Sequence, residues 1–204
     1  MDKNNYGAND IQTLSFRDAV RTKLGMYLSA DQQEAMQLGL REIIYNTRDE
    51  YEQGFGSKIF IQINTQTNKI LVRDNARGIP CGLRVDGINS LTAACTMSHT
   101  GAKHEEGVYS GAVGINGIGL KVVCLTAKEF VVTVNRDGKI YSQVFEEGFP
   151  ITDVVEKIQP KGTASTGTTI EYIRQIVDMI MPKNMKLFRT ILEYDYIEQL
   201  TDGR

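Results

Sequence analysis

Lys58–Pro80 reads KIFIQINTQTNKILVRDNARGIP, and this stretch decides the fold. Apolar and polar residues alternate in KIFIQINT and again in KILVRD, as they do in half-buried strands. Gln66–Asn68 separates the two runs as a turn, which predicts an antiparallel hairpin. Asp74 ends the second strand before a tight turn, so its carboxylate lies at a sheet edge, where it can accept from an amino group. Taken alone, a D-x-x-x-G turn is equally well explained as an ordinary turn.

A long helix is predicted before this hairpin, over Asp31–Gln53, and Gly54 and Gly56 end it. Its apolar residues recur at helical spacing, at Met36, Leu40, Ile43, Ile44 and Tyr51. Glu42 and Asn46 are four positions apart and therefore project from one face of the helix. Taken alone, this pair fits a solvated helix face as well as a shared cleft.

Gly111–Gly119, GAVGINGIG, precedes a second, buried helix predicted over Ile118–Ala127. Glycine lets backbone N–H groups approach phosphate oxygens, and a helix N-terminus favours negative charge. No G-K-[ST] follows, and a polar loop rather than a buried strand precedes the glycines, so the stretch is neither a Walker A loop nor a Rossmann fingerprint. We interpret it as a phosphate-binding loop, with a glycine linker as the alternative.

The remaining segments predict an α+β two-layer sandwich in one domain, residues 1–204. Three further strands are predicted at Glu129–Arg136, Lys139–Glu146 and Thr168–Arg174. Asp137-Gly138 joins the first two as a hairpin turn, and Thr166-Gly-Thr opens the last. The predicted helical segments are Leu14–Lys23, part of Asp86–Met97 and, as helix or mixed structure, Gln175–Leu200.

The composition excludes several classes of protein. The 204 residues carry 23 Lys+Arg and 25 Asp+Glu, so the net charge of −2 excludes a polycation held to nucleic acid by bulk charge. No apolar run reaches the roughly 18 residues of a membrane span and no signal peptide begins the chain, so we expect a soluble, cytoplasmic protein without membrane partners. Cys81, Cys95 and Cys124 lack CxxC spacing, which indicates buried apolar groups rather than a disulfide framework or zinc site.

The order of the motifs resembles the GHKL ATPase superfamily, with E-x3-N on a helix, D-x-x-x-G after a strand, G-x-x-G-x-G before a helix and G-T on a late strand. Within it, nearly the entire chain resembles the B subunits of the bacterial type IIA topoisomerases, DNA gyrase and topoisomerase IV. The resemblance is carried by Arg21–Tyr27, Glu42–Asn46 with Asp49-Glu50, Arg73–Pro80, His99–Lys103, Gly114–Gly119, Arg136–Lys139 and Thr166–Thr168. It implies the Bergerat fold, a mixed, mostly antiparallel sheet with helices on one face.

The resemblance also implies an ATP site that uses Mg²⁺. Glu42 would be the general base that activates water against the γ-phosphate, and Asn46 would hold Mg²⁺. Asp74 would accept from the adenine amino group beside Gly78 and Thr168, and Tyr109 would contact adenine. Lys103 and the Gly114–Gly119 amides would bind the phosphates. Besides Asn46, Asp74, Gly78 and Thr168, the resemblance implies these cofactor-binding residues within the chain's own site: Glu50, Arg77, Ile79, Pro80, Lys103, Tyr109, Gly114, Ile115, Asn116, Gly117, Ile118, Gly119 and Arg136.

The resemblance assigns the chain ends and partners as well. Residues 1–14 would form an arm whose Tyr6 and Ile11 reach into the partner subunit's nucleotide site, so that ATP closes a homodimer. Residues 97–118 would form a mobile ATP lid. The dimer would gate DNA passage together with the A-type subunit through domains outside this chain. A transducer lysine that contacts the γ-phosphate is also expected there, so turnover by this chain alone would be slow.

In the family, the positions of Arg77, Pro80 and Arg136 border the site of aminocoumarin inhibitors. Some positions depart from the family pattern: Ala76 replaces a glycine of the D-x-G-x-G motif, and Leu38 replaces a histidine found in many relatives. Two alternative functions stay open, a non-hydrolysing ATP-switched dimerisation module and another GHKL enzyme such as a MutL-like protein. A histidine kinase is disfavoured because Glu42 occupies the position of a hydrolytic base.

Overall fold

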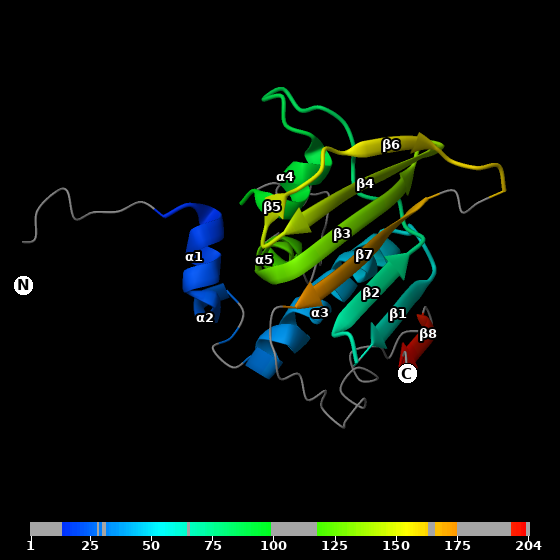
Figure 1. Cartoon of the computed structure of the whole chain (residues 1–204). Helices are drawn as coiled ribbons and strands as arrows, with labels where there is room; N and C mark the ends of the chain where they lie inside the picture. Colours follow the sequence, from blue (N-terminus) through cyan, green and yellow to red (C-terminus); the bar gives the residue numbers. More distant parts are fainter. Residues whose placement is uncertain are drawn as a thin grey trace, which may run out of the picture.

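The computed structural model describes residues 14–27, 29, 32–64, 66–98, 118–162, 166–174 and, for the backbone only, 197–202. The helices are α1 (Phe16–Thr22), α2 (Leu24–Tyr27), α3 (Gln32–Glu52), α4 (Ser90–Thr96) and α5 (Gly119–Thr126). The strands are β1 (Ile59–Asn64), β2 (Lys69–Asp74), β3 (Ala127–Arg136), β4 (Lys139–Glu146), β5 (Phe149–Pro150), β6 (Val155–Ile158), β7 (Gly167–Arg174) and β8 (Ile197–Asp202). Figure 1 shows these elements in sequence colours.

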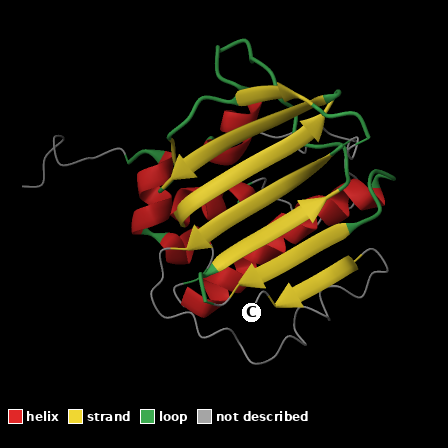
Figure 2. Ribbon diagram, turned by 45° about the vertical axis from the view of Figure 1, so that its right-hand side comes forward, coloured by secondary structure: helices red, strands yellow, loops and turns green. Residues whose placement is uncertain are grey.

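The strands form one sheet in the order β5-β4-β3-β7-β2-β1-β8, and β6 also pairs with β4. Neighbouring strands are antiparallel except β1 and β8, which are parallel. Figure 2 shows the helices gathered behind this sheet, with its other face uncovered by any helix in that view. The predicted α+β two-layer sandwich, mostly antiparallel with helices on one face, is therefore confirmed.

Local sequence explains where the elements near the site begin and end. Gly54 follows α3 with a φ of 83°, a left-handed conformation that ends a helix, and its N–H donates to the Tyr51 carbonyl at 2.8 Å. The β3–β4 hairpin turns through Asp137 and Gly138, which both have positive φ values, of 53° and 73°. Two left-handed residues are what a type I′ hairpin turn requires, as the Asp-Gly pair predicts.

The main core lies between the sheet and the helices. Every second residue of β1 is buried, at Ile59, Ile61 and Ile63, and these side chains share one cluster with Ile43 and Ile44 of α3. The alternation predicted for KIFIQINT thus marks the face that α3 covers. A second, smaller cluster joins α1 to α5, with Val20, Val122 and Leu125 buried in it.

Several expectations need correction. Tyr51 was expected on the apolar stripe of the long helix, but it lies in the last turn of α3 and is 40% exposed. Within the segment predicted as helix or mixed structure, Ile197–Asp202 is a strand, and its parallel pairing with β1 depends on a contact distant in sequence. Thr166–Thr168 therefore does not open the last strand. The strand β6 was not predicted either, since all four of its residues are exposed and show no alternation.

The other described features agree with expectation. Cys95 and Cys124 are buried, and Cys81 is partly buried. Among the described residues, none of the helices combines the length and apolar character that crossing a membrane demands. The arm residues 1–13 and most of the lid, residues 99–117, lie outside the described ranges.

Candidate functional site

The Asp74 carboxylate lies where β2 ends, between β7 and α3. Its Oδ1 accepts from the backbone N–H of Ala76 at 2.9 Å and from that of Thr168 at 3.1 Å. Its Oδ2 accepts from the Thr47 hydroxyl of α3 over a longer distance, 3.4 Å. From the Thr166–Thr168 segment the donor is thus the main chain of Thr168, and the threonine hydroxyl that donates belongs to Thr47 of α3.

The surroundings of Asp74 shift the pKa of its carboxyl group. Burial is the largest cause and raises this pKa, and the charge of Glu50 raises it further. The hydrogen bonds from Ala76, Thr168 and Thr47 act in the opposite direction, and the net shift is upward. A carboxylate oxygen can accept more than one hydrogen bond, so Oδ2 has capacity for a further donor that would stabilise the charged form.

Two glycines let the backbone close around this carboxylate. Gly167 has a φ of 143°, and a Cβ added there would run into the Asp74 carbonyl group, with the carbonyl carbon at 3.1 Å. Gly78 has a φ of 79°, and a Cβ there would meet Val134 Cγ1 at 2.9 Å and the Asn135 carbonyl oxygen at 3.1 Å. The glycines of D-x-x-x-G and T-G-T therefore serve close packing of β2, β3 and β7 at the sheet edge.

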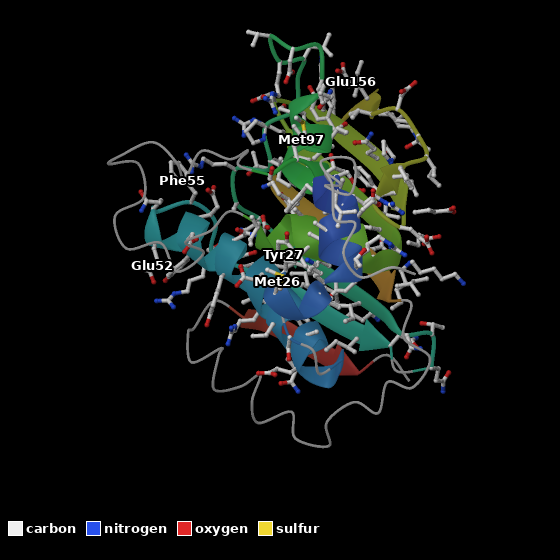
Figure 3. The ribbon with its side chains drawn as sticks, turned by 90° about the vertical axis from the view of Figure 1, so that its left-hand side faces the viewer. Met26, Tyr27, Glu52, Phe55, Met97 and Glu156 are labelled. Atoms are coloured by element: carbon white, nitrogen blue, oxygen red, sulfur yellow. The ribbon has the colours of Figure 1, made fainter. Side chains whose placement is uncertain are left out.

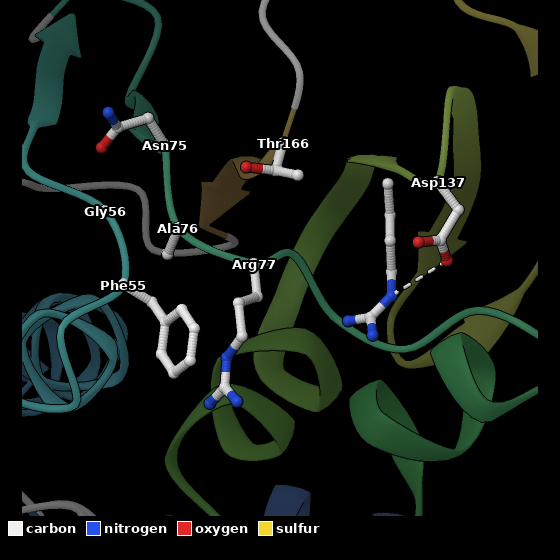
Figure 4. Close-up of a pocket in the computed structure, with 8 residues that line it drawn as sticks. Phe55, Gly56, Asn75, Ala76, Arg77, Asp137 and Thr166 are labelled. Atoms are coloured by element: carbon white, nitrogen blue, oxygen red, sulfur yellow. Dashed lines mark hydrogen bonds and ion pairs between the residues drawn. The ribbon is translucent and has the colours of Figure 1, made fainter.

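A cavity of about 310 Å³ opens beside this edge, lined by Phe55, Gly56, Asn75, Ala76, Arg77, Arg136, Asp137 and Thr166. Figure 4 shows the Phe55 ring and the Arg77 side chain next to each other on its wall. The Arg77 guanidinium lies 3.9 Å from the centre of that ring, and it donates twice to the Glu50 carboxylate, at 2.8 Å each. The Arg77 guanidinium is thus held on this wall by two residues, Glu50 of α3 and Phe55 of the segment that follows α3.

Arg136 also lines this cavity. Its Nη1 donates to the carbonyl oxygen of Gly78 at 2.7 Å, which ties the end of β3 to the turn that follows Asp74. Its Nε pairs with the exposed Asp137 at 3.3 Å, the interaction dashed in Figure 4. Both arginines of the cavity are therefore fixed by partners within the fold.

A polar stripe of α3, Glu42, Asn46 and Glu50, connects this end of the site to α5. The three residues are spaced by four and so share one face of the helix. At its far end Glu42 packs against Gly119, the first residue of α5. A Cβ added to Gly119 would lie 2.6 Å from Glu42 Cγ, so only glycine fits there without a shift. The stripe brings the predicted base and the N-terminus of α5 into direct contact.

The structure brings together six of the residues predicted for the site, Glu50, Asp74, Arg77, Gly78, Arg136 and Thr168. Ile79 instead packs against the main core, and the exposed Pro80 accepts from the Ser90 hydroxyl through its carbonyl and does not line the cavity. Ile118 packs against the smaller cluster. The predicted residues outside the described ranges are Tyr6, Ile11, Lys103, Tyr109, Gly114, Ile115, Asn116 and Gly117.

Sequence reasoning missed several residues of the site, among them Thr47 and Phe55. Thr47 is a buried polar residue on the same helical stripe as Leu40 and Ile43, and a hydroxyl at an apolar position of a helix is the signal that marks it. Phe55 follows the helix stop at Gly54 and gave no sequence signal, because its partner Arg77 is distant in the chain.

Ala76 adds a methyl group to the turn after Asp74, where the family motif has a glycine. The structure accommodates it: Ala76 is buried, and Gly56 lies against it with no side chain of its own. A Cβ at Gly56 would lie 3.2 Å from the Ala76 methyl and 3.0 Å from its Cα. The methyl group therefore occupies space that the absence of a side chain at Gly56 leaves open.

Several known proteins are similar to this chain. No protein-family model matches the chain. The chain is 34% identical over 170 residues to the topoisomerase 4 B subunit of Streptococcus pneumoniae and 36% identical over 171 residues to the DNA gyrase B subunit of Borreliella burgdorferi. Each alignment covers 83% of this chain and 26% of the relative, so the chain spans about a quarter of their length.

A solved structure shares the fold. The 43K ATPase domain of Thermus thermophilus gyrase B, in complex with an aminocoumarin, matches with a TM-score of 0.70 and 22% identity, over 85% of this chain and 43% of that one. Fold, motif order and sequence similarity agree. The chain belongs to the family of ATPase regions found in the B subunits of bacterial DNA gyrase and topoisomerase IV.

Proposed function

We propose that this chain binds ATP, with the adenine amino group donating to Asp74. One observation carries the proposal: Oδ1 of this carboxylate takes two main-chain donors, whereas Oδ2 takes one long bond from Thr47. An acceptor held in fixed position, with burial raising its pKa, favours a ligand that supplies an N–H group. Adenine has this donor and guanine has a carbonyl at the same place.

The phosphates would extend from this point along the α3 stripe towards Gly119. Helix α5 begins there, and the N-terminus of a helix favours phosphate oxygens. In this proposal Lys103, Tyr109 and the amides of Gly114–Gly117 complete the nucleotide site. The role of each rests on its place in the family motifs.

Asn46 would hold Mg²⁺ in this arrangement, since an amide oxygen is a suitable ligand for this hard cation. Mg²⁺ is usually bound by one or two side chains together with phosphates and water, not by a dedicated cage. Among the described residues no group of three or more His, Cys, Asp or Glu side chains could hold a metal ion. The bound ion would neutralise charge on the phosphates.

Glu42 would orient and deprotonate water for hydrolysis of the γ-phosphate. Its side chain is partly buried and packs on Gly119 at the start of α5, next to where the phosphates would lie. Turnover by this chain alone would be slow, because the chain spans only a quarter of its relatives and a γ-phosphate lysine is expected in a further domain.

The cavity beside Asp74 would also admit aminocoumarin-type inhibitors, as the Thermus thermophilus gyrase B domain does. Arg77 and Arg136 line that cavity, whereas Pro80 does not. In the whole protein, ATP would close a homodimer through the arm that carries Tyr6 and Ile11, and this closure would gate DNA passage with the A-type subunit.

Isothermal titration with a non-hydrolysable ATP analogue and Mg²⁺ tests the binding site. Asp74→Ala should weaken binding by about 10- to 100-fold, because one hydrogen bond to a charged group is worth about 1.5–3 kcal/mol. The matched control is Asp153→Ala, which removes an exposed aspartate from the β5–β6 connection and should leave binding unchanged. Equal affinity of wild type and Asp74→Ala would refute the placement of adenine.

Turnover in Glu42→Ala separates an ATPase from a non-hydrolysing dimerisation module. Loss of the wild-type rate with analogue binding retained supports Glu42 as the base. An unchanged rate would contradict that role, and a wild type that binds the analogue without turnover in the longest available form of the protein would favour the module.

A further inference from the structure

Helix α5 is held between two clusters of apolar side chains. Val123 and Cys124 belong to the main core, whereas Val122 and Leu125 belong to the smaller cluster shared with Val20 of α1. Figure 3 shows α1 and α2, with Met26 and Tyr27 labelled, on the side of the molecule where α5 lies. The N-terminal helices therefore pack directly on the helix whose first residue touches Glu42.

Arg21 of α1 makes the polar contacts of this packing. Its Nη1 donates to the carbonyl oxygen of Leu125 at 3.0 Å, and its Nη2 pairs with Glu147 Oε2 at 3.2 Å. Leu125 lies in the last turn of α5, where carbonyl groups lack partners within the helix. A guanidinium there also complements the negative end of the helix dipole. Arg21 thus anchors α5 at its C-terminal end.

The β4–β5 turn closes on the same end of α5. A Cβ added to Gly148 would lie 2.7 Å from Leu125 Cδ2 and 2.9 Å from Leu125 Cα, so the turn is in van der Waals contact with the last helical turn. Because Arg21 binds both Leu125 and Glu147, it holds the helix and the turn together.

We propose that Arg21 is a positioning residue for the phosphate half of the nucleotide site. Helix α5 has eight residues, and Leu125, where Arg21 is anchored, lies six residues after Gly119, about 9 Å along the helix axis. Gly119 fits against Glu42 without room for a methyl group, so a shift of α5 along its axis alters that contact directly. Arg21 itself touches no nucleotide. The inference rests on the proposed function, since it assigns Arg21 to the phosphate part of that site.

Arg17 provides the matched control on the same helix. Its Nε donates to the Glu147 carbonyl oxygen at 2.8 Å and its guanidinium lies 3.8 Å from the centre of the Phe149 ring. These contacts reach the β4–β5 turn, and none of those recorded for Arg17 reaches α5. Arg17→Met therefore removes the same charge from α1 as Arg21→Met does, while the anchor on Leu125 stays.

The test compares two ligands, the non-hydrolysable ATP analogue with Mg²⁺ and adenosine, by isothermal titration of the chain. Arg21→Met should weaken the analogue by about fivefold or more, the loss that corresponds to one misplaced hydrogen bond. Adenosine, held at Asp74, should stay within about twofold, as should both ligands in Arg17→Met. Arg21→Lys keeps the charge beside Glu147 and should give an intermediate loss of affinity for the analogue. This variant replaces Arg21→Met in the test if the methionine variant folds poorly.

Amide hydrogen exchange on the ligand-free chain gives a readout that is independent of nucleotide. Exchange over Gly119–Val123 should accelerate in Arg21→Met and not in Arg17→Met. If wild type binds and this exchange is unchanged, or if both ligands weaken equally, the positioning role is wrong while the proposed function stands. If wild type binds neither ligand, the proposed function is wrong and the role of Arg21 falls with it.

Discussion

The two ends of the polar stripe on α3 differ in how they are built. One end, next to Glu50, is where the adenine base would bind, and we call it the base end. There the carboxylate of Asp74 is held by hydrogen bonds from three separate segments, α3, the turn after β2 and the start of β7. At the phosphate end, Glu42 faces Gly119 of α5 through a packing contact between two helices. Hydrogen bonds at the end of strand β2 fix the position of Asp74, and packing between α3 and α5 fixes the position of Glu42. The proposed adenine acceptor is therefore part of the sheet, whereas the proposed phosphate end depends on where α5 lies.

The largest effect is expected from Gly167→Ala at the base end. The substitution forces a side chain into a φ of 143° and against the Asp74 carbonyl group, which should cost about 3 kcal/mol of unfolding free energy. Urea denaturation measures it. Gly162→Ala is the control, because Gly162 also has a positive φ, of 82°, but has open space around it, so it should lose only about 1 kcal/mol. Equal losses would show that the close approach to Asp74 is unimportant.

Gly119→Ala should disturb the phosphate end by a smaller amount, about 1–3 kcal/mol in stability, since the Glu42 side chain can move partly aside. Calorimetry should show weaker binding of the ATP analogue with adenosine unaffected, whereas Asp74→Ala should weaken both ligands. Gly82→Ala, where nothing lies within 4 Å, is the control. Parallel loss of both ligands would mean that the two ends are not separable.

The pH dependence of stability tests the base end alone. Because the pKa of Asp74 is raised in the folded chain above its ordinary value of 3.8, the folded state holds this proton more tightly than the unfolded state does. Stability of wild type relative to Asp74→Asn should therefore rise as pH falls through the raised pKa towards 3.8. Urea midpoints measured from pH 7 to about pH 4 follow this difference. A relative stability that falls over the same range would contradict the upward shift.

The smallest effect is expected at the cavity wall. Phe55→Leu removes the ring on which the Arg77 guanidinium lies and should cost about 0.5–1 kcal/mol, the range for an exposed cation–π pair. A double-mutant cycle with Arg77→Met isolates that coupling from the Glu50 ion pair. A coupling energy of zero would mean that the stacked arrangement contributes nothing to the base end.

The sequence predicts most of the fold because its signals are local. Alternation in Ile59–Asn64, the glycine stop at Gly54 and the Asp137-Gly138 turn each require only neighbouring residues. The strands β6 and β8 escaped prediction because β6 has no buried face and β8 depends on its parallel partner β1.

The residues of the site likewise divide into those that local motifs predict and those that depend on contacts between distant segments. Asp74, Gly78 and Thr168 follow from motif spacing, but no spacing shows that Thr47 of α3 donates to Asp74 across 27 positions of sequence. Likewise, the need for glycine at position 56 follows from the Ala76 methyl group against which Gly56 packs, and that contact cannot be read from the spacing of the two residues. Such contacts arise only when distant segments are brought together.

The central claim is that Asp74 reads an amino group, and base discrimination tests it most directly. Titration of the wild-type chain should show the non-hydrolysable ATP analogue bound about 100-fold more tightly than the GTP analogue, because a carbonyl in place of the amino group leaves two acceptors facing each other. Asp74→Asn, whose amide can donate, should reduce that ratio by about tenfold or more. Equal binding of the two analogues by wild type would contradict the account.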